Sequence, residues 1–200
     1  MTLKPPPRKL RELELATVKV YPGALFRISR YHAGEPYFGK SGANRFDDRT
    51  RVKSRRFGTC YCGFDLETAI AETLLHDEMP VRGRFNLSYS HFESHRLVRF
   101  EGNELNLADL TGVALKTLGG EGSLSTVIPY ALPQRWAMAV HRHPQLVDGI
   151  RYVSRHLNDR YAVAVFGRAL PKILKAHYTP LAEVPAIKAA LELLHISFPV

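Results

Sequence analysis

The chain has 200 residues, of which 45% are hydrophobic and 24% are charged, and its formal net charge is +9. This length suffices for one sizeable core, and the composition is typical of a soluble globular protein. No apolar run approaches the roughly 18 residues that span a bilayer, and two cysteines argue against a disulfide scaffold. We therefore expect a cytoplasmic protein without a membrane segment, whose positive charge favours a phosphate-bearing or polyanionic partner.

The first half of the chain reads as short elements around one long polar stretch. Residues 1–22 are predicted to be an N-terminal extension, and residues 23–200 a single domain. We expect a strand at 23–30, then a loop at 31–58 that holds four glycines and seven Arg or Lys residues. Loops of this length inside a compact domain usually carry function. A strand is expected at 59–64, followed by a helix to about residue 76 that Asp65 caps.

The second half mixes strands and helices without a regular alternation. Strands are expected at 94–100, 104–107, 149–156 and 161–166, with a helix after Asp109 as its cap and another at 133–141. An amphipathic helix is expected at 181–196, begun or interrupted near Pro185. No repeat or linker divides the chain. We therefore predict one compact α+β domain with mixed or antiparallel sheets.

One acid stands out in the first predicted helix. The segment "TAIAETLL" (68–75) is apolar on most sides, and Glu72 falls on the narrow remaining arc with Asp65, Thr68 and His76. The arc is either the wet edge of a buried helix or the wall of a cleft. In the preceding "TCYCG", Cys60 and Cys62 point to one face as packing residues and Tyr61 to the other.

These residues belong to a set that follows a known order along the chain. The segments are "LFRISR" with Arg27, "GANRF" with Arg45, "CYCGFDLETAIAETLLH" with Tyr61 and Glu72, and "GIRYVSRHL" with Ser154. Together they resemble the RES-domain family, toxins of bacterial toxin–antitoxin pairs, over roughly residues 23–167. The Tyr-to-Glu spacing is the most specific part. The chain has Arg45-Phe46-Asp47 where the family tends to have Arg-Trp-Asn.

The resemblance implies a fold similar to that of ADP-ribosyltransferases and an enzyme that cleaves the nicotinamide–ribose bond of NAD. Glu72, Arg27, Tyr61 and Ser154 would be catalytic, and Arg27, Arg45, Tyr61 and Ser154 would bind NAD. Phosphate, water or a protein side chain would accept the ADP-ribose, so NAD phosphorolysis and protein ADP-ribosylation both stay open. The implied partner is an Xre or helix-turn-helix antitoxin that covers the cleft. No GxGxxG follows a strand, so NAD is expected as a substrate and no cofactor is expected.

Three other interpretations use different features of the sequence. Arg49, Arg51, Lys53 and Arg55 alternate along "RTRVKSRR" and would form a basic stripe for nucleic acid or a ribonuclease function if this segment were a strand, although a solvated loop explains them more simply. A zinc hydrolase would use pairs such as His91 with His95, but the HExxH motif is absent and no metal is expected. A catalytically inactive interaction module is the third.

Overall fold

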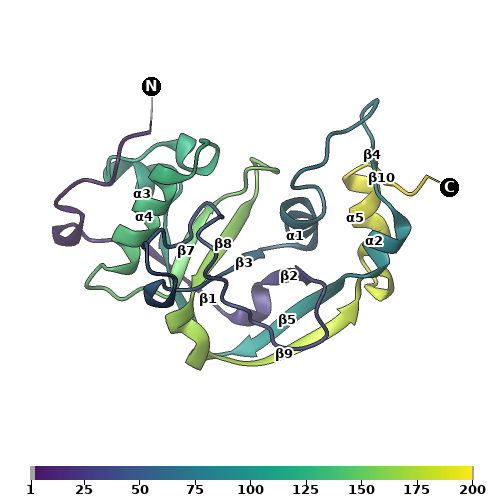
Figure 1. Cartoon of the computed structure of the whole chain (residues 1–200), viewed down its shortest axis with the longest axis horizontal. Coiled ribbons are helices and arrows are strands. Elements are labelled where there is room, and N and C mark those ends of the chain that lie inside the picture. Colours follow the sequence, from purple (N-terminus) through teal and green to yellow (C-terminus); the bar gives the residue numbers. More distant parts are fainter. Residues whose placement is uncertain (1–2, 200) are drawn as a thin grey trace.

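The computed structural model describes residues 3–199 and centres on one strongly curled mixed sheet (Figure 1). Its eight strands are, in spatial order, β1 (Thr17–Val20), β6 (Leu105–Asp109), β7 (Gly149–Val153), β8 (Tyr161–Phe166), β3 (Thr59–Gly63), β2 (Phe26–Ser29), β5 (Arg96–Gly102) and β9 (Ile173–Pro180). Only β6 and β7 run parallel, and every other neighbouring pair is antiparallel. The predicted α+β class with a mixed sheet is confirmed.

The helices form two groups that stand on either side of the central strands (Figure 1). One group consists of α3 (Gly112–Thr117) and α4 (Ala131–His141), and the other of α1 (Leu66–Thr73), α2 (Tyr89–Glu93) and α5 (Ile187–Leu193). A small parallel sheet of β4 (Phe85–Asn86) and β10 (Ile196–Ser197) lies with the second group. Short 3-10 turns occupy Leu10–Glu12, Pro22–Ala24, Lys53–Arg55, Gly122–Ser125, Gly167–Lys172 and Leu181–Glu183.

Each group of helices has its own hydrophobic cluster, and a third cluster fills the other face of the sheet. Trp136 anchors the cluster under α4, and Ile70 anchors the one under α1; neither side chain is exposed to solvent. The third cluster contains Cys60 and Cys62, so the predicted alternation of β3 is confirmed. Tyr61 points the opposite way, toward the space between the two groups of helices.

The segment before residue 23 packs against this core. Leu3, Leu10 and Leu15 are buried in the cluster around Trp136, whose indole Nε1 donates to the carbonyl of Lys4 at 2.9 Å. Strand β1 then closes one edge of the sheet by pairing with β6. The predicted extension at 1–22 is therefore built into the fold wherever it is described, because its leucines are needed to cover α4.

Most predicted elements lie within a few residues of the observed ones, and the cap of one helix is corrected. The cap of α3 is Thr111; Asp109 instead ends β6 and accepts hydrogen bonds from the Thr111 amide and hydroxyl. The predicted interruption of the C-terminal helix is confirmed, because Pro185 lies between a 3-10 turn and α5. The predicted loop is also confirmed at residues 49–56, which form no strand, so their basic side chains do not line up as a stripe.

Candidate active site

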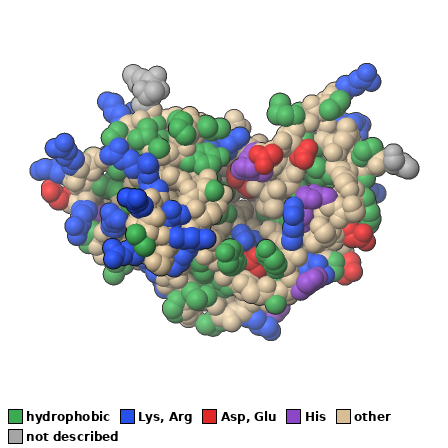
Figure 2. Space-filling view, viewed as in Figure 1, with side chains coloured by type: hydrophobic (Ala, Val, Ile, Leu, Met, Phe, Trp, Pro, Cys, Tyr) green, Lys and Arg blue, Asp and Glu red, His purple; other side chains and the backbone are tan. Residues whose placement is uncertain are grey.

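A cavity of about 380 Å³ opens between the two groups of helices. Figure 2 shows the corresponding hollow, with acidic and histidine side chains near its centre and Lys and Arg side chains gathered over the lobe of α3 and α4. The walls come from β2, β3, the exposed edge of α1, the turn at 44–45, Tyr130 at the start of α4, and the turn after β7. Segments far apart in the sequence therefore meet at this one place.

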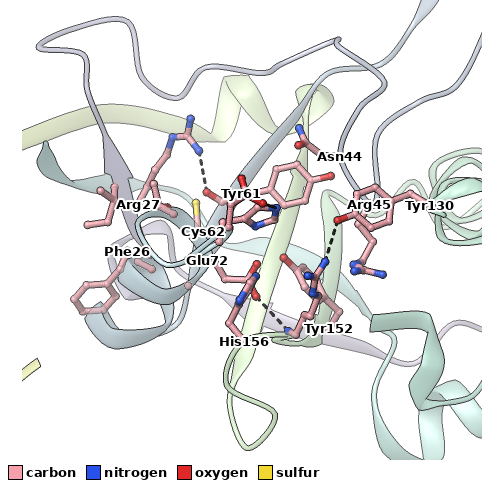
Figure 3. Close-up of a pocket in the computed structure, with 17 residues that line it drawn as sticks. Phe26, Arg27, Asn44, Arg45, Tyr61, Cys62, Glu72, Tyr130, Tyr152 and His156 are labelled. Atoms are coloured by element: carbon pink, nitrogen blue, oxygen red, sulfur yellow. Dashed lines mark hydrogen bonds and ion pairs between the residues drawn. The ribbon is translucent and has the colours of Figure 1, made fainter. Parts of the chain in front are cut away.

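Two carboxylates line the cavity: Asp77 is almost fully exposed, whereas Glu72 is half-buried and is held in place by a serine. Helix α1 presents Glu72 half-buried on its cavity side, while Ala69 and Ile70 turn inward to the core. The Ser154 hydroxyl donates to Glu72 Oε1 at 2.6 Å. The Arg155 amide donates to the same oxygen at 3.3 Å (Figure 3). These contacts leave Oε2 without a protein partner among residues 3–199, so one carboxylate oxygen is fixed and the other faces the cavity.

Ser154 is placed by the turn that ends β7. Its hydroxyl oxygen accepts from the amides of His156 and Leu157, both at 3.2 Å, as serines do at the start of a turn. The side chain is 1% exposed, and its single proton is given to Glu72. The structure therefore places Ser154 behind the carboxylate, where it orients Glu72, rather than at the surface that would touch a ligand.

Arg27 reaches the cavity from strand β2. Its Nε donates to Glu35 Oε2 at 2.7 Å and its Nη1 to the carbonyl of Tyr61 at 3.0 Å. Burial opposes the charge of Arg27, but the nearby Cys60 and Glu35 raise its pKa above the ordinary value. The guanidinium is thus a permanent, oriented cation, and Nη2 has no protein partner in the described part of the chain.

Arg45 lies on the opposite side of Glu72 from Arg27 in Figure 3. Its Nη1 donates to the carbonyl of Val127 at 2.9 Å, and its guanidinium carbon lies 4.5 Å from the ring centre of Tyr130. The residue is only 7% exposed, and its buried Nη2 has no hydrogen-bond partner within residues 3–199. Burial, with a smaller contribution from Arg155, lowers the pKa of Arg45. A buried, unpartnered guanidinium nitrogen in a cavity wall indicates a site for an anion.

Tyr61 borders the cavity with its ring and keeps its hydroxyl inside the protein. The hydroxyl donates to Asp47 Oδ1 at 3.0 Å and accepts from the Phe46 amide at 2.9 Å. Burial first, and then the charge of Asp47, raise the pKa of Tyr61 well above its ordinary value. The phenol is therefore neutral at physiological pH, and the ring is available for stacking on a flat ligand group.

Four residues outside the predicted set of site residues also line the cavity. Arg155 donates through Nη1 to the Tyr130 hydroxyl at 3.2 Å, which sets a second guanidinium beside Arg45. His76 and His156 face each other with ring centres 5.1 Å apart, and both line the cavity. Burial lowers the pKa of His156, so this imidazole is uncharged near neutral pH. Arg155 and His156 directly follow Ser154, and His76 lies four residues after Glu72. This closeness to predicted site residues is the sequence signal that could have pointed to them.

A second cavity of about 500 Å³ adjoins the first and shares Arg27, Asn44 and Tyr61 with it. Lys40, Ser41 and Lys53 line its outer part, so it is basic and has no carboxylate in its wall. The two cavities together form an elongated site in which Glu72 is the half-buried acid, Asp77 is a solvent-exposed one, and cations line the rest. Such an arrangement suits a long anionic molecule with a developing positive charge at one end.

Within residues 3–199, no three His, Cys, Asp or Glu side chains are grouped to hold a metal ion. His91 and His95 contact each other, with His95 Nδ1 bonded to the His91 carbonyl at 2.7 Å. No helix in the same range is long and apolar enough to cross a membrane.

The comparison with protein families decides the relationship of this chain. A model of the RES domain matches residues 24–187. The chain belongs to the RES-domain family. The RES segment spans every element that lines the cavity, from β2 to the turn after β7. No curated protein matches the chain significantly.

A solved structure of another protein has the same fold as this chain. The match is to a chain in the crystal structure of the M. tuberculosis MbcT–MbcA toxin–antitoxin complex, with a TM-score of 0.57. The alignment covers 89% of this chain and 91% of that chain at 13% sequence identity. At this identity the match establishes the fold alone, a single domain around a curled mixed sheet.

Proposed function

We propose that this RES domain is the toxin of a bacterial toxin–antitoxin pair and that it cleaves the nicotinamide–ribose bond of NAD. One observation carries the proposal: Glu72 is held by Ser154 in a cavity that three arginines line, whereas Asp77, the other carboxylate of the lining, has a side chain that is 94% exposed. Arg27 and Arg45 flank Glu72, and one guanidinium nitrogen of each has no hydrogen-bond partner among residues 3–199. A dinucleotide has complementary features, namely two phosphates and a ribose carbon that becomes positively charged in the transition state.

The chemistry needs only one carboxylate. Ordinary glycoside cleavage uses a second acid to protonate the leaving oxygen. Nicotinamide in NAD is already cationic, so it leaves as a neutral molecule with the electrons of the broken bond. A carboxylate about 4 Å from the oxocarbenium ion gains on the order of 4 kcal/mol at an effective dielectric of about 20. If this gain appears only in the transition state, it accelerates cleavage roughly a thousandfold.

The side chains of the site would contact different parts of NAD. Arg27 and Arg45 neutralise the diphosphate, since a guanidinium matches phosphate oxygens in geometry and charge. Tyr61 borders the nicotinamide or its ribose with the face of its ring. The rest of the dinucleotide extends past Arg27 into the second cavity, where Lys40 and Lys53 offer further positive charge. NAD enters as a substrate and leaves as products, so no resident cofactor is required.

Inorganic phosphate is the acceptor that the cavity supports best. Arg45 Nη2 is buried and has no partner in the described part of the chain. Tyr130 joins the two arginines, because Arg45 stacks on its ring and Arg155 donates to its hydroxyl. A phosphate held by these two arginines would bond through one oxygen to the ribose carbon that nicotinamide leaves. The product would be ADP-ribose phosphorylated on its anomeric carbon. Transfer to a protein side chain is the second candidate, because the cavity is open to solvent on its outer side.

The partner is a protein antitoxin of the Xre or helix-turn-helix type that covers the cavity. The resembling structure is a toxin–antitoxin complex, and the open cleft between the two helical groups offers a surface to cover. We place the protein in the cytoplasm, where its NAD substrate is found. We do not expect direct nucleic-acid binding, because the basic loop at 49–56 forms no continuous stripe.

The products of NAD identify the reaction. The purified chain is incubated with NAD, with and without inorganic phosphate, and the products are separated by mass spectrometry. Phosphorolysis gives free nicotinamide and phosphorylated ADP-ribose only when phosphate is present, whereas hydrolysis gives unmodified ADP-ribose in both cases. A mass increase of ADP-ribose on an added lysate protein would support the transferase instead. Intact NAD in the presence of phosphate and of lysate would contradict the proposal.

A further inference from the structure

A ridge separates the two cavities, and its three residues face both of them. We define the ridge as Arg27, Asn44 and Tyr61, the residues that line both cavities. A ligand that occupies both cavities must cross it. The height and shape of the ridge therefore decide how such a ligand is bent. Arg27 is anchored by Glu35, but Asn44 and Tyr61 depend on another residue.

That residue is Asp47, which lines neither cavity and is 1% exposed. Its Oδ1 accepts from the Thr59 hydroxyl at 2.5 Å and from the Tyr61 hydroxyl at 3.0 Å. Its Oδ2 accepts from the Ser41 hydroxyl at 2.9 Å, the Gly42 amide at 3.1 Å, and Asn44 through its amide at 3.1 Å and its side chain at 3.3 Å. One carboxylate thus joins the turn at 41–47 to strand β3.

These contacts require an ionised carboxylate and hold the ridge residues in one arrangement. No cation lies within ion-pair distance of Asp47 among residues 3–199, so hydrogen bonds alone stabilise its buried charge. Every contact is a donor facing an oxygen, and neither oxygen has fewer than two. An asparagine could keep its carbonyl oxygen toward the amides and turn its amino group toward the Thr59 and Tyr61 hydroxyls, which can accept as well as donate, but it would lose the negative charge that strengthens every one of these bonds.

We propose that Asp47 is a positioning residue for substrate binding: it sets Asn44 and Tyr61 at the ridge so that an elongated dinucleotide can span both cavities. The identity of the ligand as NAD rests on the proposed function above. Glu72 and Ser154 belong to α1 and the turn after β7 and share no hydrogen bond with Asp47. Loss of Asp47 should therefore weaken binding more than it slows the chemical step.

Asp48 is a matched control on the same turn. It is 5% exposed, and its carboxylate accepts from the Thr50 amide at 2.7 Å and the Phe57 amide at 3.1 Å. It therefore also pins a loop to the body of the protein. It contacts no ridge residue through its side chain and lines neither cavity. Any effect that arises only from loosening a loop should be the same at both positions.

The experiment compares Asp47→Ala, Asp47→Asn and Asp48→Ala for NAD cleavage and for melting temperature. We expect Asp47→Ala to raise KM for NAD by about tenfold or more with kcat within a few-fold, since several charge-assisted hydrogen bonds are lost. Asp47→Asn should lie between it and the wild type, and Asp48→Ala should keep the wild-type KM. Asp47→Asn preserves volume and carries the test if Asp47→Ala does not fold. A wild-type KM in both Asp47 variants, or an equal rise in Asp48→Ala, would overturn the proposal.

A second measurement needs no NAD and separates this inference from the proposed function. Amide hydrogen exchange at residues 41–46 should become faster in Asp47→Ala, while Asp48→Ala should affect residues 49–57 instead. If the wild type consumes no NAD, the proposed function fails, and the exchange result still decides whether Asp47 holds the ridge. Unchanged exchange at 41–46 in Asp47→Ala would show that it does not.

Discussion

A single hydroxyl decides which way the carboxylate of Glu72 points. Ser154 donates to Oε1 at 2.6 Å and is itself fixed by two amides of the following turn. The helical pattern of α1 placed Glu72 on the polar arc, but it could not show that residue 154 lies behind it. That contact joins positions 82 residues apart, and only the packing of β7 against the rest of the sheet creates it.

Removing this hydroxyl should reduce catalysis without unfolding the protein. In Ser154→Ala, Glu72 loses a charge-assisted hydrogen bond of about 1.5–3 kcal/mol, which corresponds to roughly a ten- to hundredfold lower kcat. KM for NAD should stay near the wild-type value, because Arg27 and Arg45 are untouched. Steady-state kinetics measures both constants. Ser125→Ala, at a serine that is 4% exposed and outside the cavity, serves as the control; equal kcat in the two variants would refute the orienting role.

Arg27 and Arg55 show why one arginine binds a ligand and another does not. Arg27 is fixed by Glu35 and the Tyr61 carbonyl at the ridge, whereas Arg55 is exposed in the basic loop. Arg27→Ala would leave the buried Glu35 carboxylate without its cation, so Arg27→Lys is the better substitution. It keeps the charge but loses the planar fork. We expect KM for NAD to rise about tenfold in Arg27→Lys and to stay unchanged in Arg55→Lys. Equal effects would indicate diffuse electrostatic attraction instead.

At the scale of elements, the sequence predicted those whose signals are local. The Asp65 side chain accepts from the Thr68 amide at 2.7 Å, as expected of the cap of α1, and β3 alternates as its cysteines indicated. Strands β1 and β9 were missed because they are the two edges of the sheet. Their outward faces are exposed, so the apolar alternation that marks a buried strand is weak. The turn at 44–47 also escaped prediction in detail, since its conformation depends on Thr59 and Tyr61.

The packing of α4 on β8 makes stability depend on pH. His141, at the end of α4, stacks on Phe57 with ring centres 4.1 Å apart and accepts through Nε2 from Arg168 at 2.8 Å. Burial and the charge of Arg168 lower its pKa to about 4. The unfolded chain, with a histidine pKa of about 6.5, then binds more protons than the folded one between these values. Stability is therefore fully present above pH 6.5 and falls as the pH is lowered toward 4.

The variant His141→Gln should flatten this dependence, because glutamine can still accept from Arg168 but does not titrate. Thermal melts between pH 7 and 4 should show a smaller decrease in Tm for His141→Gln than for the wild type. Part of the decrease should remain, since burial also lowers the pKa of His95 and His156. His32→Gln, at an exposed histidine, is the control. A slope identical to that of the wild type in His141→Gln would contradict the assignment.

At the scale of the whole molecule, the sequence indicated the class but not the order of strands. The strands at 96–102 and 105–109 are consecutive in the chain, yet β5 pairs with β2 and β9 while β6 pairs with β1 and β7. In the curled sheet four strands lie between β6 and β5, and three of them, β7, β3 and β2, help to line the cavity. The family resemblance supplied Arg27, Arg45, Tyr61, Glu72 and Ser154. Tyr130, Arg155 and the facing histidines became visible only when the fold brought them together.

The role of the Glu72 carboxylate in NAD cleavage is tested most directly by measuring NAD turnover by Glu72→Gln and by the wild type. Glu67→Gln is the matched control, because Glu67 lies on the same helix, pairs with Arg160 at 3.1 Å and is outside the cavity. Glutamine keeps the shape of Glu72 but removes the charge that stabilises the oxocarbenium ion. We expect Glu72→Gln to melt and to bind NAD like the wild type. It should cleave NAD roughly a hundred- to thousandfold more slowly, while Glu67→Gln should retain activity. A folded Glu72→Gln protein that consumes NAD at the wild-type rate would contradict this role of Glu72.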